Sequence, residues 1–359
     1  MTVRTAIALS VLLCISGVFS ARSVFAPHRG WISPAELIEH LDKPGFQHNM
    51  MLLANATKLS YTATWGSYYS HWDANATIGP GWVKSSLEAN PKDGGMHALL
   101  FVENTTSRAL LVFRGTDLGP DAVSSNADIC ADSLLWNGYH YNELPAMCQN
   151  YSVATLDYFT NAIAFTNTAM SMYSGYDFLF TGHSLGAGLA QMMASVADAE
   201  TCVSPSAFGA TSAGAVVFST PGYIHPLLNR TNISVANLDK KKFVELADRY
   251  DPVWAQCNIS FQGGIAGHRC LWHDGNESAA CVECESDPAK ISFSRPGCAA
   301  CFLERHIFAH YLHLVEGGAA KGLLCDHHVA DPCAGSEAVH VGADKCHNLV
   351  QQGCSVLHG

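Results

Sequence analysis

The sequence FLFTGHSLGAGLAQ, at residues 178–191, constrains the fold of this chain more than any other segment. An apolar, strand-like run gives way to a serine between two glycines, and a helix-forming run begins at Leu185. A strand, a sharp turn and a helix in this order predict that Ser184 lies on a tight turn at the end of the strand. Side chains two residues before and after the serine would collide in such a turn, and Gly182 and Gly186 remove them. Ser184 is therefore a candidate nucleophile.

The rest of the chain alternates between strand-like and helix-like patterns. Residues 96–102 and 108–113 are apolar runs joined by a polar segment, which predicts a hairpin, and apolar residues recur at helical spacing between Leu156 and Met170. Further strands are expected at residues 176–180, 215–219 and 242–247, and further helices near 34–41, around 50–64 and from 185 onward. Alternating strands and helices indicate an α/β fold whose mostly parallel central sheet has helices on both faces.

Composition and charge exclude several classes of protein. With 48% hydrophobic and 14% charged residues, the chain has a globular rather than a disordered composition. Its formal net charge is −11 and its only basic run is residues 240–242, so binding to nucleic acid is not expected. Beyond the N-terminus, no apolar run approaches the ~18 residues of a membrane-spanning helix, and we expect no transmembrane segment.

The N-terminal residues predict secretion. Arg4 precedes an apolar run at 6–19, and Val18 and Ser20 suit a signal peptidase, so residues 1–20 are expected to be a signal peptide. Asn-x-Ser/Thr glycosylation sequons support entry into the secretory pathway and begin at Asn55, Asn75, Asn104, Asn150, Asn229, Asn232, Asn258 and Asn276. The expected location is outside the cell or in the lumen of the secretory or vacuolar-lysosomal system, and the 18 histidines would make the charge sensitive to an acidic compartment.

The positions of the cysteines predict a cross-linked insertion and a cross-linked tail in the C-terminal part of the chain. Of the 14 cysteines, Cys14 lies in the signal peptide, which leaves an odd number in the mature chain. Residues 257–301 hold six cysteines and read as a cross-linked insertion; its two C-x-x-C pairs have spacing close to a zinc ribbon, but the oxidising compartment favours disulfides over a metal site. The tail at 317–359 contributes four more, expected to form two disulfides of its own.

Four short motifs follow one another along the chain and can be compared with those of known families. They are FRGT at 113–116, GHSLGAGLA at 182–190, FSTPG at 218–222 and DPV at 251–253. On these motifs the chain resembles the class 3, fungal-lipase-like family of the α/β-hydrolase superfamily. The resemblance extends from about residue 96 to 315. It implies an α/β-hydrolase domain at 21–316, with the cysteine-rich insertion inside it and the tail following it.

A serine hydroxyl needs a histidine to take its proton and a carboxylate to orient that histidine. In the α/β-hydrolase fold these residues follow one another in the order Ser, Asp, His. Asp251 matches the D-x-V pattern of the family, and Asp248 is the alternative in the same loop. The family usually has proline after the valine, where this chain has Trp254.

The choice of histidine is wider. His306 begins the run RHIFAHYLHLV and fits the family spacing H-x-x-x-x-Y-L. We therefore expect it to be the base, with His310 and His313 as alternatives in the same run and His327 or His328 as further ones.

The resemblance also assigns the oxyanion donors. The backbone N–H of Leu185 is expected at the start of a helix beside Ser184, and Thr116 is the second donor. A lid follows the FRGT motif in the family, so residues 117–138 are the candidate lid, with Leu134, Leu135 and Trp136 expected to be exposed and to meet a lipid surface.

Together these features predict a secreted serine hydrolase that cleaves carboxylic esters of glycerolipids, as a triacylglycerol lipase or phospholipase A1 does, at a lipid–water interface. It would need neither a cofactor nor a metal. The alternatives are a feruloyl or other non-lipid esterase on the same fold, or a catalytically inactive lipid-binding glycoprotein.

Overall fold

The structure of the chain is a computed structural model, and it describes part of the sequence. The described residues are 44–62, 73, 75–92, 94–119, 122–136, 139–198, 213–231, 233, 242–251, 253, 264–265, 267–273, 278–285 and 295–326. The expected signal peptide at 1–20, the expected helix near 34–41, and the alternative bases His327 and His328 lie outside these residues.

In this part of the chain, eight strands form a single sheet in sequence order. They are β1 (Trp82–Ala89), β2 (Ala98–Glu103), β3 (Arg108–Phe113), β4 (Asp177–Gly182), β5 (Ala213–Phe218), β6 (Phe243–Asp248), β7 (His268–Trp272) and β8 (Leu323–Asp326). Strands β3 to β7 are parallel, and β1, β2 and β8 extend the sheet in antiparallel pairing. The parallel centre brings the carboxyl ends of β3, β4, β5 and β6 to one edge of the sheet.

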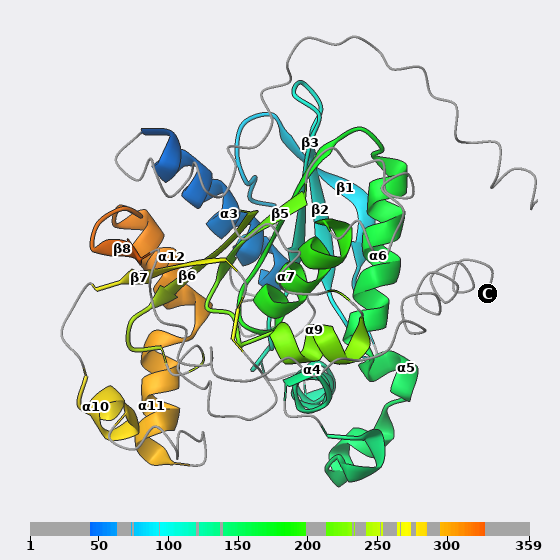
Figure 1. The fold of residues 1–359 in the computed structure, drawn as a ribbon, viewed down its shortest axis with the longest axis vertical. Helices are drawn as coiled ribbons and strands as arrows, with labels where there is room; N and C mark the ends of the chain where they lie inside the picture. Colours follow the sequence, from blue (N-terminus) through cyan, green and yellow to red (C-terminus); the bar gives the residue numbers. More distant parts are fainter. Residues whose placement is uncertain are drawn as a thin grey trace, which may run out of the picture.

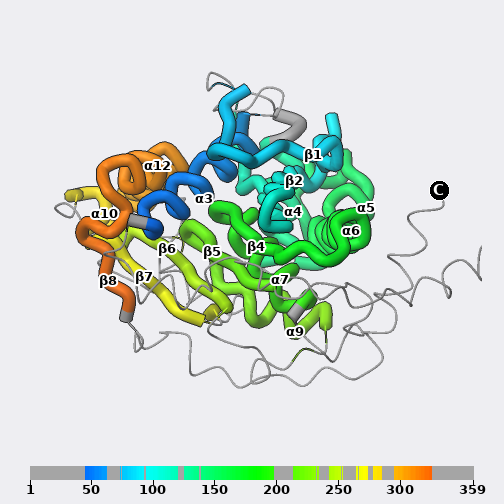
Figure 2. The backbone as a smooth tube through the Cα atoms, turned by 90° about the horizontal axis from the view of Figure 1, so that it is seen from above, coloured from blue at the N-terminus to red at the C-terminus, as the bar shows by residue number. Residues whose placement is uncertain are grey.

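Helices cover both faces of the sheet (Figure 1). The α-helices are α3 (Pro44–Thr62), α4 (Ala122–Trp136), α5 (Val153–Leu156), α6 (Tyr158–Met172), α7 (Leu185–Asp198), α9 (Ile224–Arg230), α10 (Ala279–Glu285), α11 (Pro296–Arg305) and α12 (Phe308–Glu316), and the 3-10 helices are η2 (Tyr141–Glu143) and η3 (Ala146–Asn150). Residues of α4, α6, α7 and α9 share one apolar core with the sheet, and residues of α3 and α12 share another. Figure 2 shows α3 and α12 on one side of the strands, and α7 and α9 on the other.

The α/β-hydrolase fold predicted from the sequence is therefore the fold of the chain. The hairpin of β2 and β3, the strands β4, β5 and β6, and the helices α3, α6 and α7 lie where the sequence patterns predicted them. The strands β1, β7 and β8 were not predicted. No helix in the described residues is long and apolar enough to cross a membrane.

Four cysteines of the insertion form two disulfides within it, as the sequence favoured. Cys281 pairs with Cys301 and Cys284 with Cys298, which joins α10 to α11 in a helical hairpin next to the start of α12 (Figure 1). The tail differs from the prediction, because Cys325 of β8 pairs with Cys270, its partner across the antiparallel ladder on β7. Cys325 therefore does not belong to a disulfide within the tail, and it fastens the last described strand to the sheet.

Candidate active site

The turn between β4 and α7 holds Ser184 in a strained backbone conformation. Its φ angle is 57°, in the left-handed region that L-residues rarely adopt. A side chain at Gly186 would overlap the carbonyl oxygen of Phe113, and one at Gly182 would lie 2.6 Å from the backbone of Gly186. The two glycines therefore allow the tight turn that the sequence predicted. Ser184 itself is only partly buried.

Three side chains that lie far apart in the sequence meet at this turn. His306 Nε2 lies 2.8 Å from Ser184 Oγ, and His306 Nδ1 lies 2.8 Å from Asp251 Oδ2 and 3.1 Å from Asp251 Oδ1. His306 and Asp251 are buried. A carboxylate on Nδ1 holds the proton there, which leaves Nε2 as an acceptor for the hydroxyl proton of the serine. The structure thus brings together the serine, histidine and aspartate that the sequence favoured.

The alternative residues form a separate cluster. Asp248 accepts a hydrogen bond from His310 Nε2 at 2.7 Å and another from the backbone N–H of Tyr250, and Arg305 lies 3.5 Å from its carboxylate. His313 is exposed on α12. Neither Asp248 nor His310 contacts Ser184 or His306 through a described hydrogen bond. Both residues therefore serve to hold α11 and α12 at the end of β6.

A second histidine supports His306 through the backbone. His183 Nε2 donates to the carbonyl oxygen of His306 at 2.7 Å, and the hydroxyl of Tyr61 on α3 lies 2.8 Å from His183 Nδ1. Burial lowers the pKa of His183 well below its usual value, and the neighbouring His306 adds to this effect. The ring is therefore neutral, with one nitrogen able to donate and the other able to accept.

The predicted oxyanion donors both lie near Ser184: Leu185 follows it in the chain, and Thr116 follows Gly115, where a Cβ atom would lie 3.2 Å from the Cβ atom of Ser184. Leu185 is the first residue of α7, where a backbone N–H has no partner inside the helix. Thr116 follows β3 at the same edge of the sheet, and its hydroxyl donates to Asp132 Oδ2 on α4 at 2.7 Å. Asp132 also accepts from Trp136 Nε1 at 3.0 Å. Asp132 therefore orients the side chain of Thr116.

We expect the stability of this protein to depend on the protonation of Asp132. Burial raises the pKa of Asp132 to about 7, and the nearby Asp128 acts in the same direction. Because the folded state holds this proton more tightly than the unfolded chain does, the contribution to stability is present at low pH and is lost as pH rises from about 4 to about 7. The change Asp132→Asn removes the titration, so the variant should lose less stability than the wild type across this range.

The measurement is the melting temperature of both proteins between pH 4 and pH 8. The buried histidines His97 and His183, whose pKa values are lowered by burial, act in the opposite direction, but they are common to both proteins and cancel in the comparison. Parallel curves for the wild type and Asp132→Asn would contradict the prediction.

The prediction that Leu134, Leu135 and Trp136 of the candidate lid are exposed is wrong. Leu135 and Trp136 are only 1% and 4% exposed, and Leu134 is partly buried. The ring of Trp136 packs so closely on α7 that a Cβ atom at Gly188 would lie 2.5 Å from it. A large ring that finds both a glycine surface and a partner for its N–H is more stable inside than in water.

The helix α4 is fastened at several points. Cys130 forms a disulfide with Cys148, and Asp128 accepts hydrogen bonds from Arg114 at 2.6 Å and from Tyr158 at 2.7 Å. Arg114 belongs to the FRGT motif, so the buried ion pair with Asp128 joins that motif to α4. Leu135 and Trp136 are therefore part of the core, whereas Leu118 and Ile129 of the same segment are 46% and 37% exposed.

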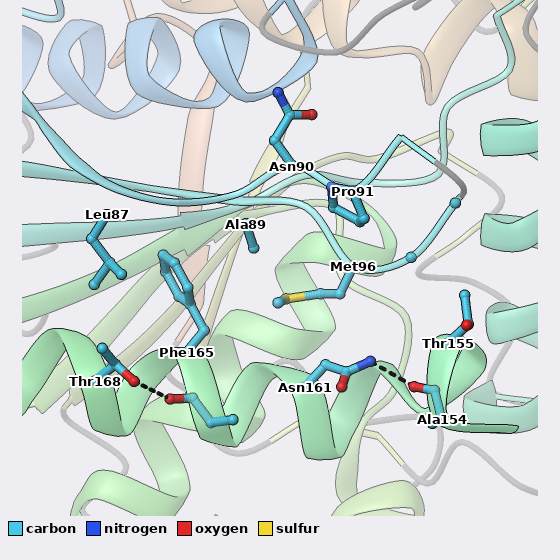
Figure 3. Close-up of a pocket in the computed structure, with 13 residues that line it drawn as sticks. Leu87, Ala89, Asn90, Pro91, Met96, Ala154, Thr155, Asn161, Phe165 and Thr168 are labelled. Atoms are coloured by element: carbon cyan, nitrogen blue, oxygen red, sulfur yellow. Dashed lines mark hydrogen bonds between the residues drawn. The ribbon is translucent and has the colours of Figure 1, made fainter. Parts of the chain in front are cut away.

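A separate hollow of about 700 Å³ lies between the end of β1 and α6 (Figure 3). Leu87, Met96 and Phe165 line it together with smaller residues. Its lining includes none of Ser184, His306 and Asp251. It is thus distinct from the place where these three side chains meet.

Four residues around the site were not singled out by the sequence. Ser219 and Tyr311 both contact Asp251, and they lie inside motifs that were quoted for other reasons. Asp132 and Tyr61 lie in segments with no distinctive pattern. A side chain that orients another needs only a hydroxyl or carboxylate at the right place in space, and no local spacing marks it.

The fold is that of the α/β-hydrolases, and Ser184, His306 and Asp251 meet at the edge of its sheet. Residues 110–231 match the model of the family "Lipase (class 3)", so this segment of the chain is similar to that family. This match supports a carboxylic ester hydrolase of the lipase type. No match to a curated protein was found.

Several solved structures are similar to the chain. The Lip2 lipase from Yarrowia lipolytica is 15% identical with a TM-score of 0.35, and the alignment covers 64% of this chain and 80% of that one. A mutant form of MDLA from Penicillium cyclopium is 17% identical with a TM-score of 0.39, covering 67% and 82% respectively. Lipase II from Rhizopus niveus is 16% identical with a TM-score of 0.35, covering 65% and 83%.

Proposed function

We propose that the protein is a secreted serine hydrolase that cleaves carboxylic ester bonds of glycerolipids through an acyl-enzyme intermediate. The observation that carries this proposal is the continuous hydrogen-bonded path from Ser184 Oγ to His306 Nε2 and from His306 Nδ1 to Asp251, with both distances 2.8 Å. The family match supports lipid esters as the substrate class. The chain's own residues supply every group that the reaction needs.

The reaction begins when Ser184 Oγ attacks the acyl carbonyl carbon and its proton passes to His306 Nε2. Asp251 keeps the imidazole oriented and stabilises its positive charge. The negative oxygen of the tetrahedral intermediate accepts hydrogen bonds from the backbone N–H groups of Leu185 and Thr116, while the hydroxyl of Thr116 donates to Asp132. His306 then gives the proton to the departing alcohol, and water cleaves the acyl-enzyme in the same way.

Labelling with a fluorophosphonate tests the mechanism. The probe phosphonylates an activated serine, so the wild-type protein should be labelled and mass spectrometry of its peptides should place the label on Ser184. The Ser184→Ala protein should not react. Equal labelling of the two proteins would contradict the mechanism, and a folded wild-type protein that never reacts would favour the inactive lipid-binding alternative.

A panel of triglycerides, phosphatidylcholine, short-chain esters and feruloyl esters then tests the substrate class. Glycerolipid hydrolysis should exceed hydrolysis of feruloyl esters, and it should rise when the lipid forms an interface. Faster hydrolysis of feruloyl esters than of every glycerolipid would overturn the lipid part of the proposal while leaving the serine mechanism in place.

Glycosylation tests the proposed secretion. Asn75, Asn104 and Asn150 are exposed, whereas Asn55 is partly buried in α3 and its side-chain nitrogen donates to the carbonyl oxygen of Ile78 at 3.4 Å. In protein made by a eukaryotic secretory host, the three exposed sequons should carry N-glycans and Asn55 should not. The readout is the mass of each peptide before and after enzymatic removal of the glycans. Secreted protein with a glycan on Asn55 and none on the exposed three would contradict this assignment.

A further inference from the structure

Ser219 occupies a strained and fully buried position beside the proposed triad. It follows the last residue of β5, its φ angle is 47°, and its exposed fraction is 0%. A non-glycine residue in the left-handed region costs roughly 1–2 kcal/mol, and such residues persist only where the surroundings hold them. Its N–H donates to the carbonyl oxygen of Leu246 at 2.8 Å, and the carbonyl oxygen of Phe218 just before it accepts the N–H of Ser184 at 3.1 Å. The residue is thus fixed between the nucleophile turn and β6.

The hydroxyl of Ser219 contacts two members of the triad. It donates to Asp251 Oδ2 at 2.5 Å, and its oxygen lies 3.1 Å from His306 Nδ1. A serine hydroxyl has one proton to donate and two lone pairs that accept. With the proton given to Asp251, the lone pairs are available to the Nδ1–H of His306. The N–H of His306 is therefore shared between Asp251 and Ser219.

The carboxylate of Asp251 is fully buried and depends on such donors. Its Oδ2 also accepts from the hydroxyl of Tyr311 at 2.5 Å, and its Oδ1 accepts from the backbone N–H of Val253 at 2.8 Å. A buried charge is costly unless hydrogen bonds satisfy it. Ser219 is the donor that reaches Asp251 from β5, so it holds the carboxylate from the strand next to the nucleophile turn.

We propose that Ser219 is a positioning residue of this site: its hydroxyl fixes the carboxylate of Asp251 and the Nδ1–H tautomer of His306, and the strained backbone at this position serves that contact. Ser219 acts through Asp251 and His306 and touches no substrate. The inference rests on the proposed serine mechanism and extends it.

The changes Ser219→Ala and Ser219→Gly separate this role from packing. Both remove the hydroxyl, but glycine also relieves the backbone strain, which alanine retains. We expect each variant to lower kcat by about 10- to 100-fold with KM within about twofold of the wild type, because a loosened catalytic group costs rate and not binding. Labelling of Ser184 by the fluorophosphonate should slow by the same factor.

Ser107 provides a matched control for the strain. It is a second serine with positive φ, 54°, and it lies on the turn between β2 and β3. Ser107→Gly should raise the melting temperature slightly and leave kcat unchanged. If Ser219 only filled space, Ser219→Ala, which keeps the Cβ atom, would retain the wild-type kcat and Ser219→Gly would lose activity only in parallel with its stability, and the proposal would be overturned.

A double-mutant cycle with Asp251→Asn tests whether Ser219 acts through Asp251. The substrate is an activated p-nitrophenyl ester, so that low rates can be measured. In the Asp251→Asn background, Ser219→Ala should change kcat by less than about twofold, because residues that act as a unit are not additive. The same loss in both backgrounds would overturn the proposal, as would single variants with wild-type kcat. Failure of the serine mechanism is recognised separately, by a wild-type protein that is not labelled at Ser184.

Discussion

Replacing His306 with alanine is expected to lower kcat by about five orders of magnitude while the protein stays folded, because the loss of the base of a serine triad removes nearly all of its rate advantage. His306 is the only described histidine within hydrogen-bond distance of Ser184 Oγ, at 2.8 Å. Without it, nothing accepts the hydroxyl proton when the serine attacks. The measurement is kcat and KM on a soluble ester, with circular dichroism as the check on folding.

His310→Ala is the matched control, since His310 was an alternative base in the same run of the sequence. Its Nε2 bonds to Asp248 at 2.7 Å, so its loss leaves a buried carboxylate with one donor fewer. This should cost about 1–3 kcal/mol of stability and change kcat by less than about threefold. The assignment of His306 would be wrong if His306→Ala kept more than a tenth of the wild-type kcat, and a large loss in His310→Ala, His327→Ala or His328→Ala would then identify the base.

Replacing Gly186 with alanine is expected to destabilise the protein by at least about 3 kcal/mol, the upper end of the cost of inserting a methyl group into a packed site. The new Cβ would overlap the carbonyl oxygen of Phe113 and lie 2.6 Å from the carbonyl carbon of Arg114. These are backbone atoms of β3 and of the FRGT turn, which cannot rotate away. The turn that carries Ser184 and the strand end that leads to Thr116 would have to separate.

Denaturation in urea measures this change, and Gly45→Ala is its control. Gly45 lies in the first turn of α3, and a Cβ atom there would have no neighbour within 4 Å. Alanine in a helix is favoured over glycine by about 0.5–1 kcal/mol, so the control should be neutral or slightly stabilised. A Gly186→Ala protein as stable as Gly45→Ala would show that the turn is looser than the structure describes.

The parts of the fold that the sequence predicted are those with a strong local pattern. The strands β2 and β3 have a turn between two apolar runs, and α7 has small and apolar residues along its length. The strand β1 was missed because its sequence, WVKSSLEA, mixes buried and exposed positions without clear alternation. Such a segment at the edge of the sheet adopts the strand conformation because its backbone pairs with that of β2. The same holds for β7 and β8, which pair at the opposite edge across the Cys270–Cys325 disulfide.

The burial of the candidate lid could not be predicted from the sequence for a different reason. The residues Leu134, Leu135 and Trp136 are apolar, and apolar residues serve equally well on a lipid-facing surface and in a core. Only the packing of Trp136 on Gly188, a contact between segments about fifty residues apart, places the ring inside.

The sequence by itself determined the tight turn at Ser184, because the glycines around it and the strand and helix on either side are all local. It also named Asp251 and His306, by a motif and by chain order, without showing that they meet. The tertiary structure decided which histidine reaches the serine, and it disclosed Ser219, Tyr311 and Asp132 as supporting residues. The reason is physical: a catalytic hydrogen bond depends on angstrom-scale distances between strand ends and helices, and those distances are set by packing over the whole sheet.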